Sequence, residues 1–225
     1  YFPSIREACK AILPLRECSV SAAELMDRNA LRAVEDEEGM PEVLRALPDE
    51  AVALLIDTSA NDEDTLQKQF AEIEAKLFSV QTLYPISFTT DPTLYATYWR
   101  VRSGLFTSAA AGRPKGTVSI IEDIAFRGEV LGDALTNVRD VLSAHGYPDA
   151  VMWGHLLDGN VHFTIFPDIN KAEGIENYAS FMYKLTEVVL RYDGSLKAEH
   201  GTGRNMAPFV KQEWGEDIYE LMREI

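Results

Sequence analysis

Cysteine and long apolar runs are both scarce in this sequence. Its two cysteines, Cys9 and Cys18, lie near one end of the chain, so they cannot form a disulfide framework or ligate an iron-sulfur cluster unaided. This cysteine usage fits a reducing compartment. No apolar run approaches the roughly 20 residues that a helix needs to cross a bilayer. The first residues, Tyr1 to Pro3, contain no initiator methionine and do not resemble a signal peptide, so we expect a longer parent chain.

Basic residues are also few. The chain has 21 Lys and Arg against 36 Asp and Glu, a formal net charge of −15 over 225 residues. A chain this acidic, without a basic run, is a poor partner for a nucleic-acid backbone or an anionic membrane surface. By contrast, 46% of the residues are hydrophobic and 10% are aromatic, which supports a sizeable core and excludes wholesale disorder. The length suits one large domain or two small ones.

Hydrophobic periodicity predicts alternating strands and helices, most clearly in the second half of the chain. The predicted order is strand 117–126, helix 130–146, strands 150–157 and 160–166, a helix that stops at Asp193-Gly194, and strand 195–199. This β-α-β-β-α-β order over 117–199 is that of a ferredoxin-like, split βαβ unit. Such a unit places two helices on one face of an antiparallel sheet.

The first half of the chain predicts part of a second, similar unit. Strand 51–58, helix 62–80 and strand 83–89 follow one another, and a further helix opens at Asp91-Pro92. Residues 19–26 fit either a strand or the start of a helix. We therefore expect an α+β fold in which duplicated ferredoxin-like units share one antiparallel sheet.

Three of the four histidines lie in two short polar segments, 154–162 and 199–204. In the first segment, Asp158-Gly159 favours a two-residue type I′ turn because both positions tolerate a positive φ. That turn would pair His155 with His162, with Cβ atoms about 4.5 to 5.5 Å apart, so that two imidazoles converge on one ion. Alternatively, the two histidines bind only neighbouring groups on a half-buried sheet. The face they share would also carry Trp153, Leu157, Asn160 and Thr164, opposite an apolar, core-facing set.

The second segment adds Glu199 and His200 at the end of the predicted strand 195–199. Two neutral imidazoles and one carboxylate leave open coordination positions on a divalent metal, as catalytic sites do. Alternation along a strand would point Glu199 and His200 to opposite sides. Glu199 is therefore the predicted third metal ligand, and His200 is a candidate base.

Other residues are candidates for binding a substrate. Arg102 could hold a carboxylate through a bidentate contact, or simply face solvent on its helix. Lys115 and Arg204 are further carboxylate candidates, and Asn160 would either orient a ligand or cap the hairpin turn. The segment Gly201-Thr202-Gly203 matches a dinucleotide-binding loop poorly and fits better a backbone that passes close to a ligand or reverses direction.

Two motifs carry a resemblance to a known family. The segment His155-Leu-Leu-Asp-Gly-Asn-Val-His162, followed by Lys197-Ala-Glu-His-Gly-Thr-Gly-Arg204, resembles the paired signature of the C-terminal domain of FAD-linked oxidases. This vanillyl-alcohol-oxidase-like superfamily includes D-lactate dehydrogenases, glycolate oxidase and D-2-hydroxyglutarate dehydrogenase. Further similar blocks are Ala22-Ala-Glu-Leu-Met-Asp27, Trp99-Arg-Val-Arg-Ser-Gly-Leu-Phe106 and Ile121-Glu-Asp-Ile-Ala-Phe126.

The resemblance implies roles for individual residues. His155, His162 and Glu199 would hold a divalent metal, either zinc, manganese or iron. His200 would take the proton of the substrate 2-hydroxyl while hydride passes to the flavin, and the metal would orient that hydroxyl and lower its pKa. Arg102 would bind the substrate carboxylate.

The resemblance also bears on the flavin and on the choice of substrate. Gly201, Arg204 and Asn205 are expected to contact the flavin cofactor. The sequence departs from the family pattern at Leu157, where glycine is frequent, and at Thr164, where relatives can carry asparagine. Both departures lie on the proposed site face and leave the identity of the 2-hydroxy acid open.

A glycine-rich FAD-binding domain precedes this domain in the family, and nothing in 1–225 resembles it. We therefore expect residues 1–225 to be a single substrate and metal domain of a longer FAD-dependent D-2-hydroxy-acid dehydrogenase, with D-lactate favoured. The ending 204–215 is most similar to the long bacterial D-lactate dehydrogenase type, in which an iron-sulfur region follows. The isolated chain would be inactive because the hydride acceptor is missing.

The expected partners are the FAD-binding domain of the same protein, a small 2-hydroxy acid, and an electron acceptor that the sequence does not identify. The expected location is the cytoplasm, either free or peripherally at the inner face of the membrane. Two non-catalytic alternatives remain. One is a ferredoxin-like module that binds a small carboxylate or a metal as a sensor, and the other is an assembly domain whose sheet face is an interface.

Overall fold

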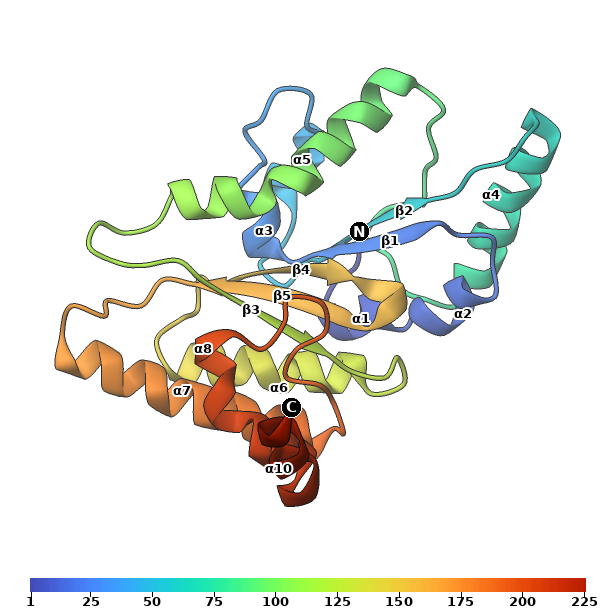
Figure 1. Cartoon of the computed structure of the whole chain (residues 1–225). Coiled ribbons are helices and arrows are strands. Elements are labelled where there is room, and N and C mark those ends of the chain that lie inside the picture. The colour runs from blue at the N-terminus through green and yellow to red at the C-terminus, as the bar shows by residue number, and fades with distance from the viewer.

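A five-stranded antiparallel sheet organises the chain in a computed structural model that describes residues 1–225 (Figure 1). The strand order across the sheet is β2-β1-β4-β5-β3, so the hairpin of β4 and β5 lies between strands from distant parts of the sequence. The strands are β1 (Ala22–Met26), β2 (Ala53–Asp57), β3 (Ile120–Ala125), β4 (Val151–His155) and β5 (Asn160–Ile165). The predicted α+β class and antiparallel sheet are confirmed.

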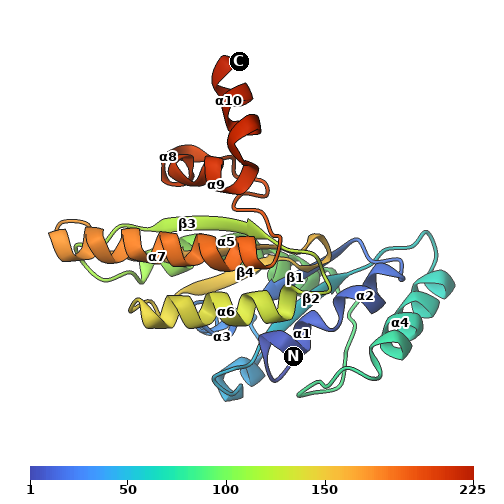
Figure 2. The same ribbon diagram turned by 90° about the horizontal axis from the view of Figure 1, so that it is seen from below.

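Helices pack on both faces of this sheet, and one face is covered more completely. The long helices α6 (Leu131–Ala144) and α7 (Ala172–Arg191) lie side by side on that face, together with α1 (Ile5–Cys9) (Figure 2). On the other face, α3 (Arg28–Arg32) and α5 (Pro92–Ala111) cover only part of the sheet. The remaining α-helices are α2 (Ile12–Arg16), α4 (Glu63–Leu77), α8 (Gly203–Met206), α9 (Val210–Trp214) and α10 (Glu216–Glu224), with 3-10 helices at Glu42–Ala46, Leu156–Asp158 and Ala207–Phe209.

The main core lies between the sheet and helices α1, α6 and α7. Alternate residues of the strands face it, such as Leu25, Met152 and Phe163, and all three are fully buried. The period of two along each strand sends the intervening residues to the opposite face. A smaller core between α3, α5 and β4 includes Val101 and Trp153 and holds α5 over that second face. No helix combines the length and apolarity that a membrane span requires.

Helix starts follow their capping signals closely. α5 begins at Pro92, and the Asp91 side chain accepts from the Thr93 backbone N–H, as the Asp-Pro pair predicts. α4 begins one residue later than expected from an Asn61 cap, because the Asp62 side chain accepts from the Thr65 N–H. Its end at Leu77 is close to the predicted 80.

Two predicted strands are wrong. Residues 83–89 form no ladder, and Pro85 in that run has no N–H to donate. The second unit therefore lacks its last strand. Residues 195–199 make only a single bridge, between Ser195 and Ala125, before their N–H groups turn to side chains. The order β3-α6-β4-β5-α7 agrees with the predicted unit up to that bridge, which occupies the place of its final strand.

The hairpin of β4 and β5 has a longer turn than predicted. Residues 156–158 form a turn of 3-10 helix that Gly159 ends in the left-handed conformation, at φ 68°. The register therefore pairs His155 with Asn160 and Trp153 with His162, so the predicted direct pairing of the two histidines is wrong by two residues. Because the shift is even, both histidines keep the same face of the sheet.

We predict that Gly159→Ala destabilises the protein by about 3 kcal/mol or more. The new Cβ would stand 2.0 Å from the Phe126 carbonyl oxygen, and a side chain at positive φ adds strain. Gly116→Ala is the matched control, since Gly116 also has a positive φ, 88°, but open space around it. The control should lose only about 1 to 2 kcal/mol. Urea unfolding measures both, and equal losses would contradict the packing argument.

Candidate metal and substrate site

Four neighbouring strands bring polar side chains to the face of the sheet that α6 and α7 leave uncovered. His155 on β4 pairs with Glu24 on β1, and His162 on β5 pairs with Asp123 on β3. Each of these residues alternates with a core-facing neighbour, which places all four on the same face. Glu24, Asp123 and His162 are buried, and His155 is half-buried.

The ring nitrogens of the two histidines converge on Glu199. His155 Nε2 lies 3.4 Å and His162 Nε2 lies 3.0 Å from Glu199 Oε1. One donor atom from each residue lies within 4.8 Å of the others, close enough to surround a single ion. The structure therefore brings together the three predicted ligands, although the histidines are diagonal rather than directly opposed. Two imidazoles and a carboxylate are a donor set that suits zinc, manganese or iron.

A carboxylate stands behind each histidine, on the ring nitrogen that faces away from Glu199. His155 Nδ1 is hydrogen-bonded to Glu24 Oε1 at 2.9 Å, and His162 Nδ1 lies 3.3 Å from Asp123 Oδ1. The bond to Glu24 raises the pKa of His155 above its ordinary value, although burial opposes the shift. With a proton on Nδ1, each neutral ring presents its Nε2 lone pair to the same point, as metal-binding histidines do.

Charge at the cluster also favours a cation. Glu24, Asp123 and Glu199 bring three carboxylates, and Arg102 brings the one guanidinium that contacts them. With neutral imidazoles, three negative charges against one positive charge leave a surplus of two. A divalent ion between His155, His162 and Glu199 would compensate that surplus, so these residues fit the predicted metal.

Asp123 is fully buried and is held by the backbone of the segment that carries Glu199 and His200. Its Oδ2 accepts hydrogen bonds from the N–H groups of Ala198, Glu199 and His200, at 2.9, 2.7 and 2.8 Å. Burial alone would raise the pKa of Asp123, but His162 and the three N–H donors outweigh burial and hold it well below the ordinary value. The side chain is therefore an anion at neutral pH.

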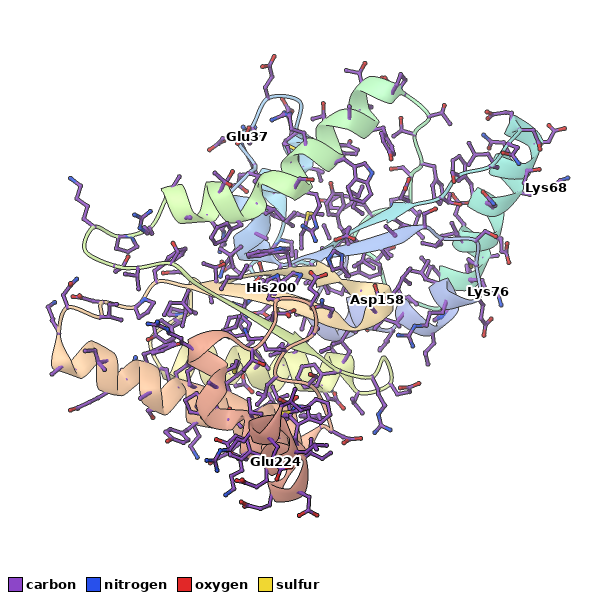
Figure 3. The ribbon with its side chains drawn as sticks, viewed as in Figure 1. Glu37, Lys68, Lys76, Asp158, His200 and Glu224 are labelled. Carbon is purple, nitrogen blue, oxygen red and sulfur yellow. The ribbon has the colours of Figure 1, made fainter.

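His200 lies on the same side as Glu199, contrary to the prediction from strand alternation. The segment is not a strand, so alternation does not apply, and the His200 ring stacks on the His162 ring at 4.6 Å and 3°. His200 Nε2 lies 3.9 Å from Glu199 Oε1. In Figure 3 His200 lies over the middle of the sheet. The predicted base thus adjoins the predicted metal ligands and stays partly accessible to a substrate.

Arg102 joins the cluster from α5 through Glu24. Its Nε donates to Glu24 Oε2 at 2.8 Å and its Nη2 donates to the same oxygen, while Nη1 has no partner within the chain. Burial works against ionisation of Glu24, but His155 and Arg102 hold the pKa of Glu24 below its ordinary value. Arg102 therefore links α5 to the cluster of histidines and carboxylates, and its Nη1 remains free to bind a further anion.

Of the other residues predicted to bind substrate, Asn160 lies beside the histidines and Lys115 does not. Asn160 stands opposite His155, and its buried Oδ1 has no hydrogen-bonding partner. The hydroxyl of Thr164, on the same face, is also buried and unpartnered. Lys115 lies in the exposed loop between α5 and β3 and makes no ion pair with the cluster, so the structure does not bring it to the site.

The three residues expected to contact the flavin lie just beyond His200. Gly201 is exposed and has a positive φ of 73°, which suits the predicted reversal of the backbone. Arg204 is exposed on α8 and forms no ion pair within the chain. Asn205 donates its amide to Glu122 on β3, so this side chain is committed to an internal contact.

Glu24 and Asp123 are site residues that sequence reasoning missed. Each lies inside a block that resembles the family, Ala22 to Asp27 and Ile121 to Phe126, but the resemblance assigned neither a role. An isolated acid in an apolar strand was the available signal for Glu24. For Asp123 the signal was the pair Glu122-Asp123 inside a strand, which sends one carboxylate to each face.

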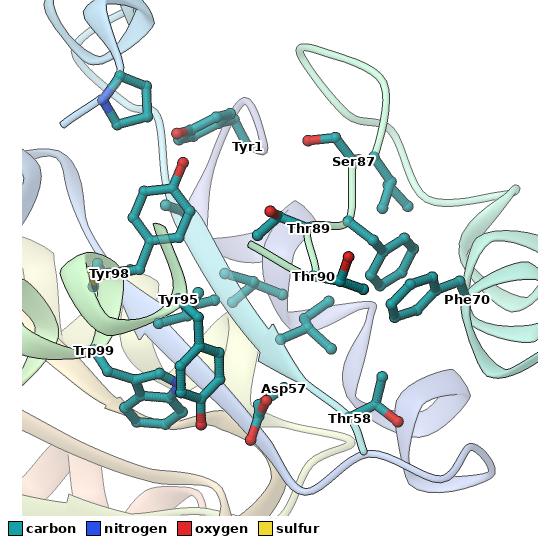
Figure 4. A pocket seen from close by; sticks show the side chains of 18 of the residues that line it. Tyr1, Asp57, Thr58, Phe70, Ser87, Thr89, Thr90, Tyr95, Tyr98 and Trp99 are labelled. Atoms are coloured by element: carbon teal, nitrogen blue, oxygen red, sulfur yellow. The ribbon is translucent and has the colours of Figure 1, made fainter. Parts of the chain in front are cut away.

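A cavity of about 550 Å³ adjoins this cluster over the neighbouring strand (Figure 4). Leu55 of β2 lines it and stands opposite Glu24 in the ladder. Most of the lining is apolar, and the rings of Phe70 and Phe88 stack within it at 4.1 Å. Neither the histidines nor Glu24 nor Arg102 line this cavity, so it is a neighbour of the histidine and carboxylate cluster and not part of it.

The fold and this site are those of an α+β domain that carries a cluster of histidines and carboxylates on the open face of its sheet. The family of FAD linked oxidases, C-terminal domain, matches residues 1–225, and the chain belongs to this family. The resemblance seen in the sequence is thereby confirmed over the whole chain.

Curated relatives extend this result. The chain is 24% identical, over its full length, to 38% of the mitochondrial D-lactate dehydrogenase [cytochrome] of Kluyveromyces lactis. It is 23% identical, over 89% of its length, to 40% of the glycolate oxidase subunit GlcD of Bacillus subtilis. A D-2-hydroxyglutarate dehydrogenase of Xanthomonas citri is 28% identical over 58% of the chain and 27% of that protein. The chain thus spans about two fifths or less of these relatives.

Proposed function

We propose that this chain is the substrate and metal domain of an FAD-dependent dehydrogenase that oxidises a D-2-hydroxy acid. The observation that carries the proposal is the convergence of His155 Nε2, His162 Nε2 and Glu199 Oε1 beside His200 and Arg102. Membership of the family of FAD-linked oxidases and similarity to proteins named for D-lactate, glycolate and D-2-hydroxyglutarate support it.

In this proposal each residue of the chain has a defined task. The unpartnered Nη1 of Arg102 binds the substrate carboxylate and so fixes which carbon faces the flavin. His155, His162 and Glu199 hold a divalent metal, which polarises the 2-hydroxyl when bound. His200, whose ring is held parallel to that of His162, accepts the hydroxyl proton.

The hydride acceptor is FAD on another domain of the same protein, so the isolated chain has no turnover of its own. An iron-sulfur cluster in a further C-terminal region would take no part in substrate oxidation; in this proposal it would receive electrons from the reduced flavin. D-lactate is the first substrate to test, because two of the relatives cited above bear names of enzymes for small 2-hydroxy acids.

The test uses the full-length flavoprotein with D-lactate, glycolate and D-2-hydroxyglutarate, and L-lactate as the matched enantiomer. We expect oxidation of at least one of the first three acids and far slower oxidation of L-lactate, because a fixed carboxylate and a fixed hydroxyl present only one C–H bond to the flavin. A full-length protein that oxidises none of them would contradict the proposal and favour a non-catalytic module that binds a carboxylate or a metal.

A further inference from the structure

We infer that Asp123 is a positioning residue that prepares the metal site from both sides, by fixing the ring of His162 and by docking the segment that carries Glu199 and His200. The inference rests on the proposed metal site and extends it to a residue that contacts no substrate. The evidence is that Asp123 directs one carboxylate oxygen to the backbone of residues 198–200 and the other to the ring of His162.

Asp123 Oδ2 accepts the backbone hydrogen bonds of residues 198–200, which have no partner in a strand or helix. After the single bridge at Ser195, the backbone N–H groups of residues 198–200 all point at Asp123 Oδ2, at distances of 2.7 to 2.9 Å. No ladder or helix holds Glu199 or His200 in place. Successive N–H groups that surround an anion form a concave nest. Without the carboxylate, these donors would lose their common acceptor and the two side chains would lose their placement.

The other oxygen, Asp123 Oδ1, faces His162 and determines which of its ring nitrogens carries the proton. Oδ1 lies 3.3 Å from His162 Nδ1, and both atoms are buried and make no hydrogen bond elsewhere in the chain, so each is the polar atom available to the other. A carboxylate accepts and cannot donate, so a neutral His162 beside it carries its proton on Nδ1. The lone pair then lies on Nε2, 3.0 Å from Glu199 Oε1. A carboxylate behind a histidine also makes the other ring nitrogen a better metal donor.

Asp123 could instead be a ligand itself, in the cluster formed with His162 and His200. The three backbone N–H groups saturate Oδ2. An ion bound by Asp123 would therefore have to use Oδ1 and displace the contact of that oxygen with His162 Nδ1. The two roles differ in what His200 does. If Asp123 only positions, replacing His200 leaves metal affinity unchanged, whereas His200 is a required ligand in the alternative cluster.

The adjacent residue offers a matched control. Glu122 points to the other face of β3, is fully buried, and holds the same segment through Lys197 Nζ at 2.8 Å and through Asn205. It anchors residues 197 to 205 but contacts neither histidine of the metal site. A general loosening of the segment would therefore follow from changing either carboxylate, whereas a positioning effect on His162 would follow only from changing Asp123.

The experiment titrates zinc into chelator-treated full-length protein by calorimetry, comparing wild type with Asp123→Asn, Glu122→Gln and His200→Ala. We expect Asp123→Asn to lower zinc affinity by about 10- to 100-fold, as loss of such an outer partner does elsewhere. Glu122→Gln and His200→Ala should stay within about threefold of wild type. Equal losses in Asp123→Asn and Glu122→Gln, or a large loss in His200→Ala, would overturn the inference.

A second measurement does not depend on metal, and its deciding result comes from the wild-type protein. Nitrogen-15 NMR of the histidine side chains in metal-free wild type reports which ring nitrogen of a neutral His162 bears the proton. We expect His162 with its proton on Nδ1, and a shift toward Nε2 in Asp123→Asn. A wild-type proton on Nε2 would overturn the inference. If wild type binds no zinc, the proposed metal site fails, and the NMR result still decides the role of Asp123 toward His162.

Discussion

Replacing His162 with alanine is expected to lower the affinity for a divalent metal by more than about 100-fold, since even loss of an outer partner costs up to that much. The side chain is almost fully buried and supplies the ring nitrogen nearest to Glu199, at 3.0 Å. Its removal also leaves Asp123 without the ring that lies beside its Oδ1. Metal content after dialysis and calorimetric titration of the purified protein measure the effect.

His145→Ala is the matched control for that change. His145 caps the end of α6, where its ring contacts the Val141 carbonyl oxygen and the Ser180 hydroxyl, on the opposite face of the sheet from the metal ligands. Metal affinity should be unchanged in this variant. Similar metal content in wild type, His145→Ala and His162→Ala would contradict the ligand assignment and favour an assembly role for the sheet face.

Replacing Arg102 with methionine is expected to destabilise the metal-free protein by about 3 kcal/mol at neutral pH. Both partners of the Arg102–Glu24 pair are nearly buried, with side chains 11% and 5% exposed. Breaking such a pair costs about 3 to 5 kcal/mol because a buried charge stays behind. Glu24 would still have its hydrogen bond with His155, so we expect a loss at the lower end of this range. Urea unfolding measures the difference.

The pH dependence of that loss follows from Glu24. Its pKa in the folded protein lies below the ordinary value of 4.5, so its ionised form stabilises the fold fully above that value. The advantage of wild type over Arg102→Met should therefore shrink as the pH falls below about 4.5. Arg100→Met is the control on the same helix, because Arg100 pairs with Glu37 at the surface, and it should lose about 1 kcal/mol or less. Equal losses at residues 100 and 102 would contradict a special role for the buried pair.

Much of the fold could be predicted because its signals are local. Asp91-Pro92 starts a helix, and the apolar alternation through Met152 and Phe163 defines a core face. Both predictions are confirmed. The two failures concern pairing that local pattern does not determine. Residues 83–89 have apolar character but no strand beside them, and Ser195 makes one bridge before Asp123 draws the next N–H groups away.

The sequence was enough to predict which face of the sheet carries the site, but not which side chains contact one another there. His155 and His162 share a face under any even register, so the error in turn length did not separate them. Glu199 and His200 were predicted to point apart, and they lie together because the segment that carries them is shaped by a side chain and not by a ladder. Partners from distant strands, such as Glu24, cannot be read from spacing along the chain.

Anaerobic reduction of the flavin in the full-length protein tests the central proposal most directly. The substrate is D-lactate, or whichever of the three acids is oxidised, and bleaching of the flavin is followed before and after removal of divalent metal. We predict rapid bleaching that slows by at least about 100-fold without metal and returns when zinc or manganese is restored. Bleaching at the same rate after complete removal of metal, with His162→Ala behaving as wild type, would contradict the proposal that His155, His162 and Glu199 hold the ion that serves this reaction.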